Sequence, residues 1–199
     1  MKRKPGSGSG KNAKGTNPGA LKSRSATVKP TQAQDIPGKI VPSKLADYLE
    51  IITIAVFQAG TSWAMVRKKW PNFRKAFAEF DPTAVSKFDQ TDIDRLMQDT
   101  GILRSEKKIR GTIDNASALL ALDSKYGSFQ SYLRSFDGYD QLSADLQKRF
   151  KYLGEMSVYY FLFRVSEKVP PFEPWILTIE GDHPRMREMV EKAAAEDTR

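Results

Sequence analysis

The sequence of 199 residues contains no cysteine and a single histidine, His183. Without cysteine it can form neither a disulfide framework nor a thiolate metal site. One histidine leaves only carboxylates for a zinc site, so we expect no metal and no cofactor. No apolar run reaches eighteen residues without a charge, so no segment is predicted to span a membrane. These absences favour a soluble, cytoplasmic protein.

The first forty residues also lack aromatic side chains, and their charge is almost all of one sign. Residues 1–40 hold nine Lys or Arg and one acid, Asp35. Such a segment cannot bury enough apolar surface to offset its loss of conformational entropy, so we predict a disordered basic tail. It either associates with DNA, where each cation at a phosphate releases counterions, or it is a solubilising or export-related tail. A transit or nuclear role for it stays open.

Residues 41–199 have balanced charge, with 23 basic and 23 acidic residues, and their length suits one compact domain. Apolar residues recur there at helical spacing, and neither a strand pattern nor an internal repeat is present. The fold class predicted is all-α, a compact helical bundle. The predicted helices span residues 43–59, 63–70, 71–80, 82–85, 91–100, 105–122, 128–136, 141–151, 155–165 and 184–197.

Local signals set several of these boundaries. Pro71 separates two helices that meet at Trp70, and Asp81 caps a short helix with Pro82 at its first position. Thr91 with Asp94 resembles a capping box. The segment 155–165 is apolar on nearly every face, which predicts the buried central helix. The prolines of segment 169–177 predict extended chain over the surface.

Residues 91–121 have the form of a helix, a short turn containing Gly101, and a second helix with basic residues at its start. In a helix-hairpin-helix element, turn amides and the N-terminus of the second helix bind a phosphate oxygen. The alternative is a glycine that only ends the first helix in a left-handed cap. The residues predicted to contact DNA are Thr100, Gly101, Ile102, Leu103, Arg104, Lys107 and Lys108.

A polar turn precedes Trp63, at the end of the first predicted helix. An aromatic ring at such a turn can stack on an extruded base, while Gln58 and Ser62 offer hydrogen bonds. The alternative is that Trp63 is a core residue, as we expect for Trp70 and the aromatic residues that follow it.

The order of these segments is informative. QAG-x-SW at 58–63 precedes FRKAFAEFDPTAV at 73–85, DIDRLMQDTGILRSEKKI at 92–109, and KYLGEMSVYYF at 151–161. Over residues 44–165 the chain resembles the DNA-3-methyladenine glycosylase I family, a branch of the helix-hairpin-helix glycosylases. The resemblance implies a base-excision repair enzyme, a monomer associated with the bacterial nucleoid. Such an enzyme bends duplex DNA, extrudes a damaged base and hydrolyses its N-glycosidic bond without metal.

The chain departs from the family pattern at its pocket. The resemblance implies a glutamate three residues before Gln58, where this sequence has Ala55, and it implies zinc ligands that this sequence lacks. Glu155 is the candidate replacement carboxylate, with a first-turn acid favoured by the helix dipole as the alternative. Asp47 and Glu50 are weaker candidates, and Tyr159 is expected to add stacking surface in the pocket.

These departures leave two other functions open. One is a DNA- or damage-binding protein that keeps the hairpin scaffold without base excision. The other is a protein-interaction module on the same fold.

Overall fold

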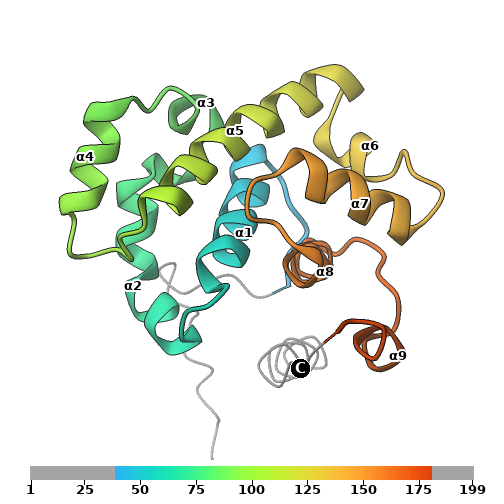
Figure 1. Ribbon diagram of the computed structural model, residues 1–199. Helices are drawn as coiled ribbons and strands as arrows, with labels where there is room; N and C mark the ends of the chain where they lie inside the picture. Colours follow the sequence, from blue (N-terminus) through green and yellow to red (C-terminus); the bar gives the residue numbers. More distant parts are fainter. Residues whose placement is uncertain (1–38, 181–199) are drawn as a thin grey trace, which may run out of the picture. The chain divides into compact units, whose positions relative to one another are not determined.

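The computed structural model describes residues 39–180, and no strand occurs within that range. The all-α prediction is confirmed. The elements are α1 (Leu45–Gln58), α2 (Trp63–Ala76), the 3-10 helix η1 (Ala78–Phe80), α3 (Pro82–Val85), α4 (Gln90–Gln98), α5 (Glu106–Tyr126), α6 (Phe129–Leu133), α7 (Tyr139–Arg149), α8 (Glu155–Arg164) and α9 (Phe172–Ile176) (Figure 1). None of these helices is both long and apolar enough to cross a bilayer. His183, the helix predicted over 184–197 and the basic tail, apart from residues 39–40, lie outside the described residues.

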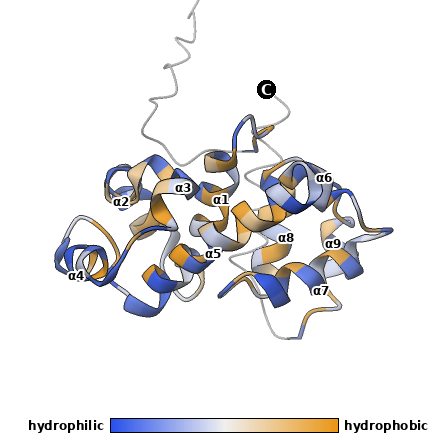
Figure 2. Ribbon diagram, turned by 90° about the horizontal axis from the view of Figure 1, so that it is seen from above, coloured by the Kyte–Doolittle hydropathy of each residue, from blue (hydrophilic) through white to orange (hydrophobic). Residues whose placement is uncertain are grey.

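Two helices form the centre of the core. The predicted central helix, α8, is buried from Val158 to Leu162, but α1 is buried as completely, from Ile51 to Phe57. Helix α1 packs against both α5 and α8, and Figure 2 shows its hydrophobic colouring. Burying one Leu or Ile side chain contributes about 1.5–3 kcal/mol, so α1 and α8 supply much of the driving force for folding.

Helix α2 runs through Pro71 without a break, so the prediction of two helices meeting there is wrong. A proline inside a helix removes one hydrogen bond and crowds the preceding turn. Contacts on both sides of Pro71 hold the helix together. The Trp70 ring stacks on Phe73 at 5.0 Å between centroids. Glu50 Oε1 accepts hydrogen bonds from Trp70 Nε1 at 2.7 Å and from Arg74 Nε at 2.6 Å.

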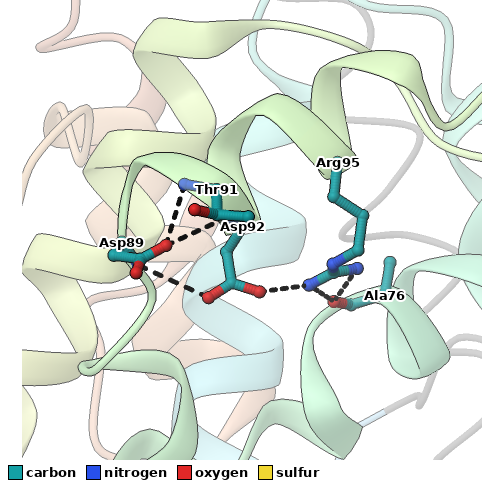
Figure 3. Close-up of polar contacts among 5 residues, drawn as sticks. All are labelled: Ala76, Asp89, Thr91, Asp92 and Arg95. Carbon is teal, nitrogen blue, oxygen red and sulfur yellow. Dashed lines mark hydrogen bonds and ion pairs between the residues drawn. The ribbon is translucent and has the colours of Figure 1, made fainter.

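The N-terminus of α4 begins two residues earlier than the predicted capping box. Asp89 caps the helix, because its Oδ1 accepts from the backbone N–H groups of Thr91 and Asp92, and Asp92 returns a bond to the Asp89 N–H (Figure 3). The same Asp92 carboxylate pairs with Arg95 at 3.0 Å, and Arg95 reaches the carbonyl of Ala76 at the end of α2. Helix α4 is therefore fixed against α2. By contrast, the Asp81–Pro82 cap is confirmed, with Asp81 Oδ1 accepting from Thr83 N.

The segment 169–177 was predicted to be extended, and this is wrong for its second half. Helix α9 forms there with Pro174 as its third residue. A proline in the first turn costs little, because the first amides of a helix have no helical acceptor. Trp175 anchors α9, its ring stacked on Tyr159 of α8 at 3.9 Å and 20°.

Candidate nucleic-acid interface

The predicted hairpin lies between α4 and α5, over residues 99–105. Gly101 does not adopt a positive φ, so it is not the left-handed cap that the alternative reading describes. Space is what requires it. A Cβ at Gly101 would lie 2.9 Å from Asp99 Oδ1 and 3.1 Å from Asn72 Nδ2. The Gly101 N–H donates to that Asp99 oxygen at 2.7 Å, so the turn is closed by its own carboxylate.

Helix α2 supports the hairpin through two carbonyls. Lys69 Nζ donates to the Thr100 carbonyl at 2.5 Å, and Asn72 Nδ2 donates to the Gly101 carbonyl at 3.2 Å. Sequence reasoning assigned neither Lys69 nor Asn72 a role. The sequence does contain a pair of lysines at 68–69. They lie about thirty residues before the hairpin, so only the folded chain shows that Lys69 contacts it.

The start of α5 offers unoccupied donors. Ser105 stands at the N-cap position of α5, but its side chain makes no capping hydrogen bond. Within residues 39–180, no acceptor pairs with the amides of Leu103 and Arg104. Arg104 and Lys107 are exposed beside them. An uncapped helix N-terminus with flanking cations attracts an anion such as a phosphate.

Lys108, which was also predicted to contact DNA, is engaged within the protein in this structure. Its Nζ donates to the carbonyls of Ala59 at 2.7 Å and Phe57 at 3.3 Å, at the end of α1. Burial lowers the pKa of Lys108 below its ordinary value. A cation at the C-terminus of a helix is favoured by the helix dipole. Lys108 therefore joins α5 to the turn that precedes Trp63.

That turn has the geometry expected from its sequence. Gly60 adopts φ of 73°, a left-handed conformation that glycine tolerates best, and Ser62 is the N-cap residue of α2. Gln58 is half-buried as the last residue of α1. Trp63 is partly buried and packs against the core.

A shallow groove of about 640 Å³ lies between the first turns of α2 and the hairpin. It brings together Ser62 of the polar turn with Thr100 and Gly101 of the hairpin, whereas Gln58 and Trp63 do not line it. Its remaining lining residues are Ala64, Met65, Lys68, Lys69 and Asn72. The groove therefore joins the two sequence motifs through a surface that carries two lysines.

The other predicted pocket residues lie elsewhere. Tyr159 is only 2% exposed, its hydroxyl donates to the Pro170 carbonyl at 2.9 Å, and one face of its ring is covered by Trp175. The structure therefore does not place Tyr159 at a pocket. Glu155 is exposed in the first turn of α8, the position that the helix-dipole alternative describes.

The two weaker carboxylate candidates have structural roles. Asp47 Oδ2 accepts hydrogen bonds from Ser43 N and Lys44 N, which caps α1. Glu50 holds Trp70 and Arg74 of α2, as described above. Neither carboxylate is available at the turn.

Comparison with known proteins identifies the scaffold. A family model described as methyladenine glycosylase matches residues 41–158. The chain belongs to the methyladenine glycosylase family. The DNA-3-methyladenine glycosylase 1 of Escherichia coli strain K12 is 34% identical over 134 residues, which cover 57% of this chain and 72% of the relative. The DNA-3-methyladenine glycosylase of Haemophilus influenzae is 32% identical over 126 residues, 53% of this chain and 68% of the relative.

A solved structure of the family has the same fold. The 3-methyladenine DNA glycosylase I of Staphylococcus aureus matches with a TM-score of 0.58 and 27% identity, over 66% of this chain and 81% of that one.

The resemblance implies a pocket glutamate and a set of zinc ligands, and the described residues fit neither. Ala55, where the resemblance implies a glutamate, is 3% exposed among the apolar residues of α1. Within residues 39–180, no three side chains of His, Cys, Asp or Glu gather into a metal-ligand set. The described residues therefore do not fit a structural zinc, and no step below passes through one.

Proposed function

We propose that this protein is a monofunctional DNA glycosylase that removes alkylated bases such as 3-methyladenine from duplex DNA. The observation that carries the proposal is the family match over residues 41–158, which contain both the hairpin and the polar turn. The relatives in Escherichia coli and Haemophilus influenzae are named for this activity. We further propose that it acts as a monomer on DNA of the bacterial nucleoid.

The hairpin would hold the DNA backbone. The free amides of Leu103 and Arg104 and the uncapped start of α5 support a phosphate clamp over residues 100–104. Arg104 and Lys107 would add charge-assisted contacts from exposed positions. Phosphate contacts of this kind position the DNA without reading its sequence.

The polar turn would receive the extruded base. Trp63 is only partly buried, and it follows the polar residues Gln58 and Ser62 in the chain, which we assign to the same pocket. Stacking on an aromatic side chain stabilises a base by about 1–3 kcal/mol. That gain would offset part of the cost of unstacking the base from the duplex, which is a few kcal/mol.

Excision of a 3-methylated adenine does not require the protein to protonate the leaving base. A 3-methylated adenine nucleotide carries a positive charge, so the base leaves neutral, with the electron pair of the broken bond between C1′ and the base nitrogen. Water then adds to C1′ and releases a proton. Extrusion, stacking and electrostatic stabilisation of the sugar cation are the contributions left to the enzyme.

The decisive experiment is release of free bases from methylated duplex DNA by the full chain, resolved by chromatography. We expect release of 3-methyladenine and its loss in Trp63→Ala, with Trp63→Phe as the control that keeps an aromatic face. Thermal unfolding of Trp63→Ala separates lost stacking from a lost core contact. Absence of any released base, with duplex binding retained, would overturn the enzymatic proposal.

One observation favours a second function, a DNA- or damage-binding protein without base excision. The buried Ala55 provides no carboxylate at the position where the resemblance implies one, and Glu155 is exposed. Removing one polar contact to a transition state commonly costs a hundredfold or more in rate, on the order of 3 kcal/mol. Retained binding without release would support this second function.

A further inference from the structure

One face of α5 binds two loops, the polar turn before α2 and the loop between α7 and α8. Lys108, Gly111 and Asn115 are spaced by three and four residues, so they share a face of the helix. Lys108 binds the Ala59 carbonyl of the polar turn. Asn115 binds the backbone of Lys151 twice, accepting from its N–H at 2.6 Å and donating to its carbonyl at 3.1 Å. Figure 1 shows this α7–α8 loop running beside α5.

Tyr152 projects from the loop in an unusual conformation. Its φ is 58°, a left-handed value that costs a residue with a Cβ on the order of 1 kcal/mol. The side chain is nevertheless 50% exposed, so burial of the ring does not account for the strain. Strained backbone that the surroundings hold in place is concentrated at functional sites.

The ring of Tyr152 packs against α5 at Gly111, which has no side chain. A Cβ at Gly111 would lie 2.6 Å from Cδ2 and 2.8 Å from Cε2 of Tyr152, so the ring lies directly on the helix backbone. Glycine inside a helix costs about 1 kcal/mol relative to alanine. Gly111 therefore lowers the stability of α5 slightly but leaves space for the Tyr152 ring against the helix backbone.

Charged residues of both signs lie next to Tyr152 in the chain or one helical turn from Gly111. Lys107 is one helical turn before Gly111 and is exposed, as is Lys151. Two acids are also nearby: Glu155 is three residues after Tyr152, Asp114 is three residues after Gly111, and both are exposed. A half-exposed aromatic ring with lysines beside it is the combination that binds nucleotides through stacking and phosphate contact.

We propose that Tyr152 is a DNA-contacting residue whose ring stacks on the nucleotide bordering the gap left by the extruded base. The proposal rests on the proposed function, because Lys108 places the polar turn, where the base would be received, on the same face of α5. It assigns the α7–α8 loop a role in holding the distorted duplex. Stacking on one base contributes enough for a loss of about tenfold in affinity when the ring is removed.

The test is fluorescence anisotropy of the full chain with two duplexes, one undamaged and one carrying a tetrahydrofuran abasic-site analogue. Tyr152→Gly removes the ring and also relieves the positive φ, so the fold is retained. We expect it to bind the abasic duplex about tenfold more weakly than wild type, while Tyr152→Phe stays within about twofold. Leu177→Ala, which truncates an apolar residue that is 81% exposed in another segment, is the control and leaves affinity unchanged.

A second variant moves the ring without altering it. Gly111→Ala places a methyl group where the Tyr152 ring lies, and we expect it to weaken binding of the abasic duplex in the same direction. A 2-aminopurine beside the abasic site reports the contact directly, since its fluorescence changes with wild type and not with Tyr152→Gly.

The outcomes separate the two proposals. If wild type binds the abasic duplex and both variants bind it equally well, the role of Tyr152 is overturned and the proposed function stands. If wild type binds neither duplex, both proposals fail.

Discussion

The link between Asn115 and Lys151 offers the most exacting test of the structure. Asn115 is fully buried. Its side-chain amide accepts a hydrogen bond from the backbone N–H of Lys151 and donates one to the backbone carbonyl of Lys151. Asn115→Ala removes both hydrogen bonds and leaves the N–H and the carbonyl of Lys151 facing an apolar helix. Each unsatisfied group costs about 1–3 kcal/mol when it is buried. Solvent near the exposed loop recovers part of this, so we expect a loss of about 2–4 kcal/mol.

Urea unfolding measures that loss. With a slope of about 2 kcal/mol per molar urea, the midpoint falls by about 1–2 M. The matched control is Ser117→Ala, on the same helix, where an exposed hydroxyl bonds only to the Ile113 carbonyl. We expect its midpoint to stay within about 0.3 M of wild type, because surface substitutions cost little. If Asn115→Ala shifts the midpoint no further than Ser117→Ala, the loop is held by other contacts and the reasoning is refuted.

Three further predictions follow from contacts described above. Gly101→Val forces the hairpin apart, so duplex affinity measured by anisotropy falls about tenfold, the equivalent of one charge-assisted hydrogen bond; unchanged affinity excludes the hairpin as a phosphate site. Glu50→Gln weakens the partly buried ion pair with Arg74 and lowers the free energy of unfolding by about 2 kcal/mol in urea titrations; a change below about 0.5 kcal/mol contradicts this. Tyr132 has a pKa raised by burial and by its bond to Asp145, so it stabilises the fold fully below the unfolded pKa of 10.0 and loses that contribution as pH rises above it. Tyr132→Phe therefore lowers stability by about 1 kcal/mol at pH 8, and the difference from wild type shrinks between about pH 10 and 11 in calorimetry; a constant difference refutes the linkage.

The sequence was sufficient for features set by neighbouring residues. Apolar residues at helical spacing located α1 and α5, and a segment that is apolar on nearly every face located α8. Asp81–Pro82 located the start of α3, because a cap and a first-turn proline act within one turn. These signals need no knowledge of the tertiary structure.

The errors came from contacts between distant segments. Pro71 was read as a boundary, yet Glu50, twenty residues before Trp70 and twenty-four before Arg74, holds both halves of α2. Two pairs of residues have the spacing of a capping box, Asp89 with Asp92 and Thr91 with Asp94. The sequence prediction chose the second pair, and the structure uses the first. The Asp89–Asp92 cap is supported by Arg95. This arginine pairs with Asp92 and also donates to the Ala76 carbonyl at the end of α2.

The site shows the same division. The hairpin and the polar turn were located by their glycines and their charges, whereas the residues that join them were not. Lys108 is predicted to contact DNA as one of the basic residues at the start of the second helix, and the α1 carbonyls that bind it in the structure lie about fifty residues earlier. Tyr152 gave no signal, since neither its positive φ nor the space above Gly111 can be read from sequence.

The absence of a carboxylate at the turn limits the chemistry of a glycosylase on this scaffold. Asp47 caps α1, Glu50 holds α2, and Glu155 is exposed. A neutral purine must gain a proton to leave, which requires a positioned acid near the base. A cationic base needs none, because its charge already weakens the bond to C1′. Under the proposed function, a turn without a carboxylate at Ala55 would favour excision of bases that arrive charged. We therefore expect the replacement at Ala55 to restrict the proposed enzyme to cationic bases rather than to abolish excision, with Trp63 and the hairpin holding the extruded nucleotide.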